Sequence, residues 1–312
     1  MDDMKQKLYE SLFFDIHSYT CNKNDECAEL NNSSIAGCRS KKFYRVDSRY
    51  FDNYFNDHSN YVSSIESGMP SKVIVLEKVC ALDRYRYTTH GKWLLHSEMM
   101  GTQLLDYFGC PCACNIAVHN SEKEDGEYDI FSLNFIGAGD KFYTLSNMGC
   151  SLSRGLECSV RQMEESLESE IFDDYDRKGK EKLLEDFAYS YLVRKYVARD
   201  TDFFQGNSGV IANKEKGILQ YVNFDLEYSY GESKPGLSRD LEFCASRFPI
   251  VYARFEQMVE LYRKYLNELK DEGISYQSYI QEQNVLVLAC ALREVSDCLE
   301  DRRIDTALKT HY

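Results

Sequence analysis

Residues 181–225 constrain the fold more than any other part of the 312-residue sequence. The segment opens with "EKLLEDFAYSYLVRKYVA" (181–198), where Leu184, Phe187, Ala188, Tyr191 and Leu192 form one apolar stripe at helical spacing. The polar stretch "RDTDFFQGNSG" follows, and then "GVI" and "LQYVNF" flank the turn sequence "ANKEKGI". The sequence therefore predicts a helix, a polar loop and a β-hairpin in direct succession.

The regions on either side of this segment differ in character. Before it, "KVIVLEKVCAL" (72–82) is typical of a buried strand, and "LLHSEMMGTQLLDYFG" (94–109) has helical periodicity that ends at Gly109. "CPCACNIAV" (110–118) and "IFSLNFI" predict further strands, whereas the chain after residue 238 is mainly helical. We expect an α+β protein with a small mixed α/β part, a mainly helical part and a cleft between them.

Composition excludes some functions and favours a cytoplasmic location. A net charge of −14 argues against a nucleic-acid surface, because phosphate contacts need clustered lysine and arginine. The sequence has no apolar run of transmembrane length and no secretory signal at its N-terminus, so we expect no membrane span and a cytoplasmic protein. The 12 cysteines are then free thiols, and Cys110, Cys112 and Cys114 would share one face of a buried strand rather than bind metal.

The polar loop and the hairpin contain the residue types that phosphoryl transfer from ATP requires. The Asp-x-Asp pattern alone is weak evidence for a metal site, because "DYD" at 174–176 repeats it and aspartates favour turns. Kinase loops place a catalytic aspartate five residues before a metal-binding asparagine, and Asp202 and Asn207 have that spacing. Asp202 is therefore the predicted base, and Asn207 with Asp225, after the hairpin, would bind Mg²⁺. At the same spacing Asp200 would be matched with Gln205 and not with an asparagine. We therefore expect Asp200 to hydrogen-bond within the loop instead.

A kinase also needs a strand lysine on the ATP phosphates and a helix glutamate that holds this lysine. Lys78 ends the strand "KVIVLEK", and Glu98 lies on the next predicted helix. Lys72 on the same strand and Lys42 in "KKFYRV" are competing candidates for the lysine. No GxGxxG phosphate loop is present.

At these residues the chain resembles the atypical bacterial Ser/Thr kinases of the HipA-like and CtkA-like group. Their loop has the form D-R-H-x-G-N-x-G, and "DFFQGNSG" keeps the aspartate, asparagine and both glycines but has Phe203-Phe204 in place of Arg-His. "HSEMMGTQLLDYFGCPCACNIAV" resembles the segment in which a Ser-Glu pair opens the helix. The resemblance covers about residues 72–230 and implies Glu98 as the partner of Lys78. Diverged kinases of this kind also occur among effectors that bacteria deliver into host cells.

We therefore expect a bilobal protein-kinase-like fold, with residues 1–135 as the N-terminal lobe and residues 136–312 as the C-terminal lobe. The expected activity is ATP- and Mg²⁺-dependent phosphorylation of Ser or Thr in a protein, with any activating partner unknown.

Three alternatives stay open. A kinase of phosphoinositides or other small molecules would use the same residues. A non-catalytic pseudokinase or interaction module would explain the absent glycine loop and Phe203-Phe204. In a glycosyltransferase, "DTD" itself would be the metal motif.

Overall fold

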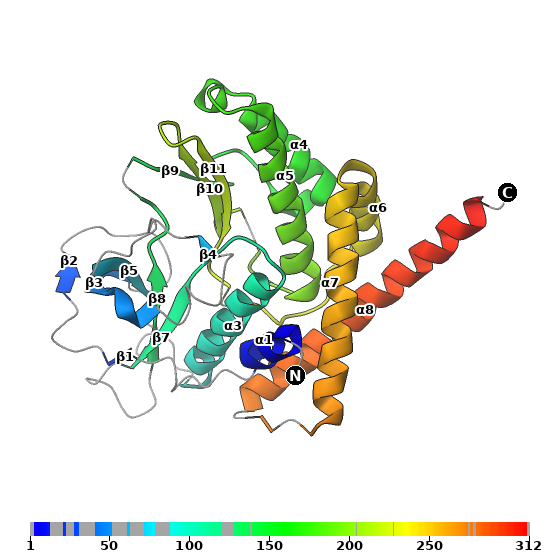
Figure 1. Cartoon of the computed structure of the whole chain (residues 1–312), viewed down its shortest axis with the longest axis horizontal. Helices are drawn as coiled ribbons and strands as arrows, with labels where there is room; N and C mark the ends of the chain where they lie inside the picture. The colour runs from blue at the N-terminus through cyan, green and yellow to red at the C-terminus, as the bar shows by residue number, and fades with distance from the viewer. Residues whose placement is uncertain are drawn as a thin grey trace.

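A computed structural model of the chain shows two small β-sheets packed with a set of α-helices (Figure 1). The structure describes residues 3–12, 21–22, 28–30, 41–51, 61–62, 72–78, 88–119, 128–137, 139–203, 205–226, 228–273, 275–276 and 279–310. None of the helices in these ranges is long and apolar enough to cross a membrane.

The first sheet has six strands in the order β1-β7-β8-β5-β3-β2. Their bounds are β1 Cys21–Asn22, β2 Ala28–Leu30, β3 Lys41–Asp47, β5 Lys72–Lys78, β7 Asn115–His119 and β8 Tyr128–Leu133. β5 lies between β3 and β8 and pairs with both in antiparallel fashion. Val73 and Val75 are buried while Ile74 between them is exposed, so one face of β5 packs into the core. The predicted strand is confirmed over 72–78, and residues 79–82 lie outside the described part.

The second sheet has five strands in the order β4-β6-β11-β10-β9. They are β4 Tyr61–Val62, β6 Cys112–Ala113, β9 Lys141–Thr144, β10 Ser208–Asn213 and β11 Ile218–Asn223. β10 and β11 form the predicted hairpin, in which Ser208 pairs with Asn223 and Asn213 with Ile218. Strands from before and after residue 135 share this sheet. The lobe boundary at that residue stays a prediction.

The helices gather beside the sheets, and α3 contacts both the sheets and other helices (Figure 1). They are α1 Asp3–Leu12, α3 Thr88–Tyr107, α4 Leu156–Leu167, α5 Arg177–Leu192, α6 Leu237–Arg247, α7 Pro249–Asp271 and α8 Tyr279–Thr310. α3 packs against β7 and β8 on one side and against α1 and α8 on the other. It begins earlier than the predicted residue 94 and ends near Gly109, which adopts the positive φ of 73° typical of a helix stop.

The helix before the polar loop does not end as a regular α-helix. All five residues of the predicted apolar stripe are buried in α5. A π-helical turn, Val193–Val197, then follows, and the amide of Ala198 donates to the carbonyl of Val193 at 2.8 Å. Such a turn admits one more residue than an α-helical turn.

The strand predicted over residues 110–118 is wrong in one respect. The chain forms two short strands there, β6 in the second sheet and β7 in the first, separated by Cys114. Cys110, Cys112 and Cys114 are all buried free thiols, and burial raises the pKa of the Cys110 thiol to about 12. Hydropathy alone could not show that this run passes from one sheet to the other.

Candidate functional site

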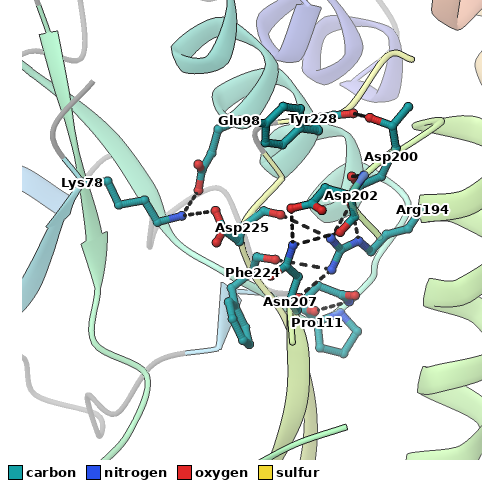
Figure 2. A network of polar contacts seen from close by, with 12 residues as sticks. Lys78, Glu98, Pro111, Arg194, Asp200, Asp202, Asn207, Phe224, Asp225 and Tyr228 are labelled. Carbon is teal, nitrogen blue, oxygen red and sulfur yellow. Dashed lines mark hydrogen bonds and ion pairs between the residues drawn. The ribbon is translucent and has the colours of Figure 1, made fainter. Parts of the chain in front are cut away.

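The lysine and glutamate predicted to form a pair lie in contact. Lys78 is the last residue of β5, Glu98 lies on α3, and the Nζ atom of Lys78 donates to Oε1 of Glu98 in the core (Figure 2). The amide of Asn115 donates to the same glutamate oxygen at 3.1 Å and to Oγ1 of Thr102 at 2.9 Å. Glu98 is therefore held from two sides. Lys42 is exposed and lies opposite Glu77 in the sheet, whereas the side chain of Lys72 is outside the described part.

Asp225 joins this pair from the second sheet. It lies two residues beyond β11, and its Oδ1 atom is 3.2 Å from Nζ of Lys78. Its φ of 59° is in the left-handed region, which non-glycine residues rarely adopt and which Asp and Asn tolerate best. The backbone turn directs the carboxylate toward Lys78 (Figure 2). Three residues that are far apart in sequence thus form one polar cluster.

Asp202 and Asn207 form the next part of the site. The Nδ2 atom of Asn207 donates to the carbonyl oxygen of Asp202 at 2.9 Å and to its carboxylate at 3.2 Å. The side chain of Asn207 is thereby fixed, and its Oδ1 atom is the one suited to a cation. Partial burial raises the pKa of the Asp202 carboxyl above its usual value; Asp200 and Asp225 add to this rise, and the bond from Asn207 opposes it.

A buried arginine that the sequence analysis did not select holds the loop from behind. Arg194 in the π-helical turn donates from Nε to Oδ2 of Asp200 at 3.0 Å and also contacts this oxygen through Nη2. Its Nη1 atom donates to the carbonyl of Asn207 at 2.7 Å, and longer contacts of 3.4 Å reach the carbonyls of Phe224 and Asp225. One guanidinium therefore binds both the polar loop and the segment that carries Asp225 (Figure 2).

Asp200 is a structural residue of the loop. It is buried; its Oδ1 atom accepts from the amide of Asp202 at 3.1 Å, while Oδ2 accepts from Arg194. Burial raises the pKa of its carboxyl, and Arg194 together with the Asp202 amide opposes that rise. The predicted hydrogen bond within the loop is present.

Phe203 replaces a basic residue of the loop that the family pattern carries, and it packs beside the buried arginine. The Cζ atom of Arg194 lies 4.6 Å from the centre of its ring, and the ring of Tyr191 meets it edge-on at 5.5 Å. Arg194 thus places a guanidinium at the loop from the preceding helix. The available sequence signal was a charged residue on an otherwise apolar helix face, three residues after Tyr191, because a buried charge needs partners.

The donor set fits a phosphate-bound magnesium ion better than a cage built by protein alone. Asn207 and Asp225 offer an amide oxygen and a carboxylate, which are the ligands that Mg²⁺ prefers together with water and phosphate. Within the described ranges no group of three or more His, Cys, Asp or Glu residues could hold a metal. Lys78, held by Glu98, is a buried cation that also contacts Asp225.

No protein-family model matches the chain, and no curated protein matches its sequence. The structure is similar to the crystal structure of the proinflammatory kinase CtkA of Helicobacter pylori, with a TM-score of 0.57. The likeness covers 93% of this chain and 99% of that chain at 10% sequence identity. At this identity the likeness concerns the fold, so the chain has a mixed α/β fold like that of a kinase. The CtkA-like part of the expected resemblance is supported in this sense, and the HipA-like part stays a prediction.

Proposed function

We propose that this protein is a bilobal, ATP- and Mg²⁺-dependent kinase that phosphorylates serine or threonine in a protein. The observation that supports it best is the convergence of Lys78, Glu98 and Asp225, from β5, α3 and the segment after β11. Asp202 and Asn207 lie beside these three residues in one polar network (Figure 2). The likeness to a kinase fold supports the same conclusion.

Each residue has a role that its surroundings suit. Lys78 would bind phosphate oxygens of ATP, and Glu98 would keep the ammonium group in place. Asn207 and Asp225 would hold Mg²⁺, which neutralises charge on the phosphates when it is bound. Asp202 would orient the acceptor hydroxyl and take its proton.

Two substitutions separate nucleotide binding from transfer. Asp225→Asn is expected to abolish the Mg²⁺-dependent rise in melting temperature that ATP produces, since a ligand that binds the native state must stabilise it. Asp202→Asn is expected to keep that rise and to lower transfer from labelled ATP roughly 10²- to 10⁴-fold, because it removes only the base. Lys214→Gln, on the exposed turn of the hairpin, is the control.

Full transfer by both aspartate variants would refute the assignment. A wild-type chain with no melting response to Mg²⁺ and ATP would favour the pseudokinase instead. The packing of Phe203 between Arg194 and Tyr191 is the observation that keeps this second candidate in view, because the partly buried ring packs against the core. Transfer to phosphoinositide vesicles, but not to proteins, would change the acceptor class and keep the catalytic assignment.

A further inference from the structure

A pocket of about 420 Å³ lies beside the loop that carries Asp202. The walls come from the loop itself, from the π-helical turn after α5, from the segments that precede α4 and α6, and from the first turn of α6. They consist of Leu152, Ser153, Gly155, Lys195, Asp200, Phe203, Lys234, Pro235, Gly236 and Arg239. Asp200 and Phe203 belong to the loop that carries Asp202, so the pocket borders this loop.

The charge of the pocket is opposite to that of the chain as a whole. The chain carries 51 acidic and 37 basic residues, yet the charged side chains of the wall are three cations and one carboxylate. That carboxylate, Asp200, is already bound by Arg194. Lys234 has neither a hydrogen bond nor an ion pair with the described residues. Within the described residues, the pocket therefore has cationic charge, at Lys234, that no side chain neutralises.

One buried aspartate behind the wall pairs with Lys195 and makes a longer contact with Arg239. Asp240 accepts from Lys195 at 3.0 Å and from the hydroxyl of Tyr196 at 2.6 Å, and it lies 3.6 Å from Nε of Arg239. Its other oxygen accepts the amide of Leu156 at 3.1 Å. Lys195 is thus paired, whereas Arg239 has only a long contact to this carboxylate and is 64% exposed.

The backbone of the pocket adds to this positive character. Gly155 and Gly236 precede α4 and α6, so the positive ends of two helix dipoles face the same space. A Cβ atom on Gly155 would lie 2.3 Å from Nη2 of Arg239, so the glycine leaves room for the guanidinium against the main chain. The two helix N-termini add to the positive potential in the pocket, most of which comes from the side-chain cations.

We propose that this pocket binds an acidic side chain of the protein substrate, so that the kinase selects serine or threonine within an acidic segment. The inference rests on the proposed function, because it assigns the pocket to the acceptor. Lys234 and Arg239 would bind the carboxylate directly through charge-assisted hydrogen bonds.

A peptide suits the pocket better than a membrane surface does. An anionic bilayer extends across the whole face of a bound protein, and a chain with a net charge of −14 is repelled by it. A single acidic side chain can enter the pocket alone. The volume also matches one or two side chains better than an extended surface.

The test uses the full chain and two synthetic peptides, each with one serine flanked either by glutamates or by glutamines. Binding is measured by fluorescence anisotropy without nucleotide, and phosphate transfer is measured separately with Mg²⁺ and ATP. The variants are Lys234→Gln, Arg239→Gln and their combination. Lys264→Gln is the matched control, because Lys264 is 64% exposed and lies on α7, away from the pocket.

We expect the wild type to bind the glutamate peptide about tenfold more tightly than the glutamine peptide. Each single variant should lose roughly threefold to tenfold of that affinity, and the double variant should lose the preference. Lys264→Gln should keep it. Equal binding of both peptides by the wild type, or an unchanged preference in the double variant, would overturn the proposal. If Arg239→Gln lowers the melting temperature, Lys234→Gln alone decides.

Two further outcomes separate this proposal from the proposed function. A glutamate preference that depends on Lys234, without any phosphate transfer, would support the pocket and contradict the kinase. Lys234-dependent binding of phosphoinositide vesicles, without a peptide preference, would contradict the acidic-peptide pocket and point to a lipid acceptor.

Discussion

Replacing Arg194 by methionine removes a guanidinium but keeps an unbranched side chain of similar length. The wild-type group is fully buried and binds the buried Asp200 carboxylate, the carbonyl of Asn207 and, at longer range, two carbonyls beyond β11. The substitution leaves Asp200 in the core without its cation. Removal of one partner from such a pair typically costs about 3–5 kcal/mol. We expect the free energy of unfolding to fall by that amount at neutral pH.

A second substitution tells the lost pair apart from lost packing. If the cost comes mainly from the stranded carboxylate, Arg194→Met with Asp200→Leu should be more stable than Arg194→Met alone by about 1–3 kcal/mol. If packing dominated, the double variant would be no better. Arg161→Met, at a 67% exposed arginine on α4, is the control and should change stability by less than about 0.5 kcal/mol.

The cost should also depend on pH. Burial already raises the pKa of Asp200, and the loss of Arg194 removes the main influence that opposes this rise. A raised folded-state pKa means that the folded state binds the proton more tightly than the unfolded state does. The stability contribution is then fully present below the ordinary pKa and is lost as the pH rises toward the folded-state value. The destabilisation by Arg194→Met should therefore be smaller near the ordinary aspartate pKa than at neutral pH.

Urea unfolding followed by circular dichroism measures all of these quantities. If Arg194→Met lowers the free energy of unfolding by less than about 1 kcal/mol, the guanidinium does not hold the loop in place and the reasoning is refuted. A cost that is the same at low and neutral pH would refute it as well, because the stranded carboxylate would then not be its source. Asp200→Asn in the methionine background should remove the pH dependence, and failure to do so would assign it to another group.

Three other substitutions test neighbouring contacts. Lys78→Met should abolish the stabilisation of the chain by Mg²⁺ and ATP in a thermal-shift assay and should itself lower the melting temperature, because Glu98 loses its lysine. Glu98→Gln should lower the melting temperature less, since the amide oxygen can still accept from Asn115, and an equal loss in both would count against this reading. Gly209→Ala should cost about 1–3 kcal/mol, because its Cβ would lie 2.4 Å from the carbonyl of Tyr143 on β9. An unchanged urea midpoint for this variant would show that β9 and β10 can separate without cost.

Local patterns predicted those parts of the fold whose sequence follows a simple period. β5 and α5 bury residues at the spacing that the sequence shows, and the β10–β11 hairpin forms where two apolar runs flank a turn sequence. The pairing of Lys78 with Glu98 could also be predicted, because the lysine ends a clear strand and the glutamate lies on a clear helix. Periodicity could not show that the strand is interrupted at Cys114, because the residues on both sides of Cys114 are buried.

The contacts behind the loop could not be predicted, because they depend on the three-dimensional path of the chain. Arg194 reaches Asn207 and the residues beyond β11 only after the hairpin folds back onto the helix. The pocket at Lys234 and Arg239 likewise needs the starts of α4 and α6 to meet. The short strands β1, β2 and β4 each have two or three residues, too few for a periodic pattern to show.

The π-helical turn at the end of α5 has a consequence for comparisons between sequences. Its extra residue rotates the side chains that follow it within the turn by roughly 100°, the angle per residue of an α-helix, relative to an uninterrupted helix. This rotation lets Arg194 face the loop while Lys195 and Tyr196 bind Asp240. An alignment with a related chain whose helix is uninterrupted would need a one-residue gap within Val193–Val197. Without that gap, Asp202 and Asn207 would be matched one position out of register, and a shared Asp-x-x-x-x-Asn spacing would be overlooked.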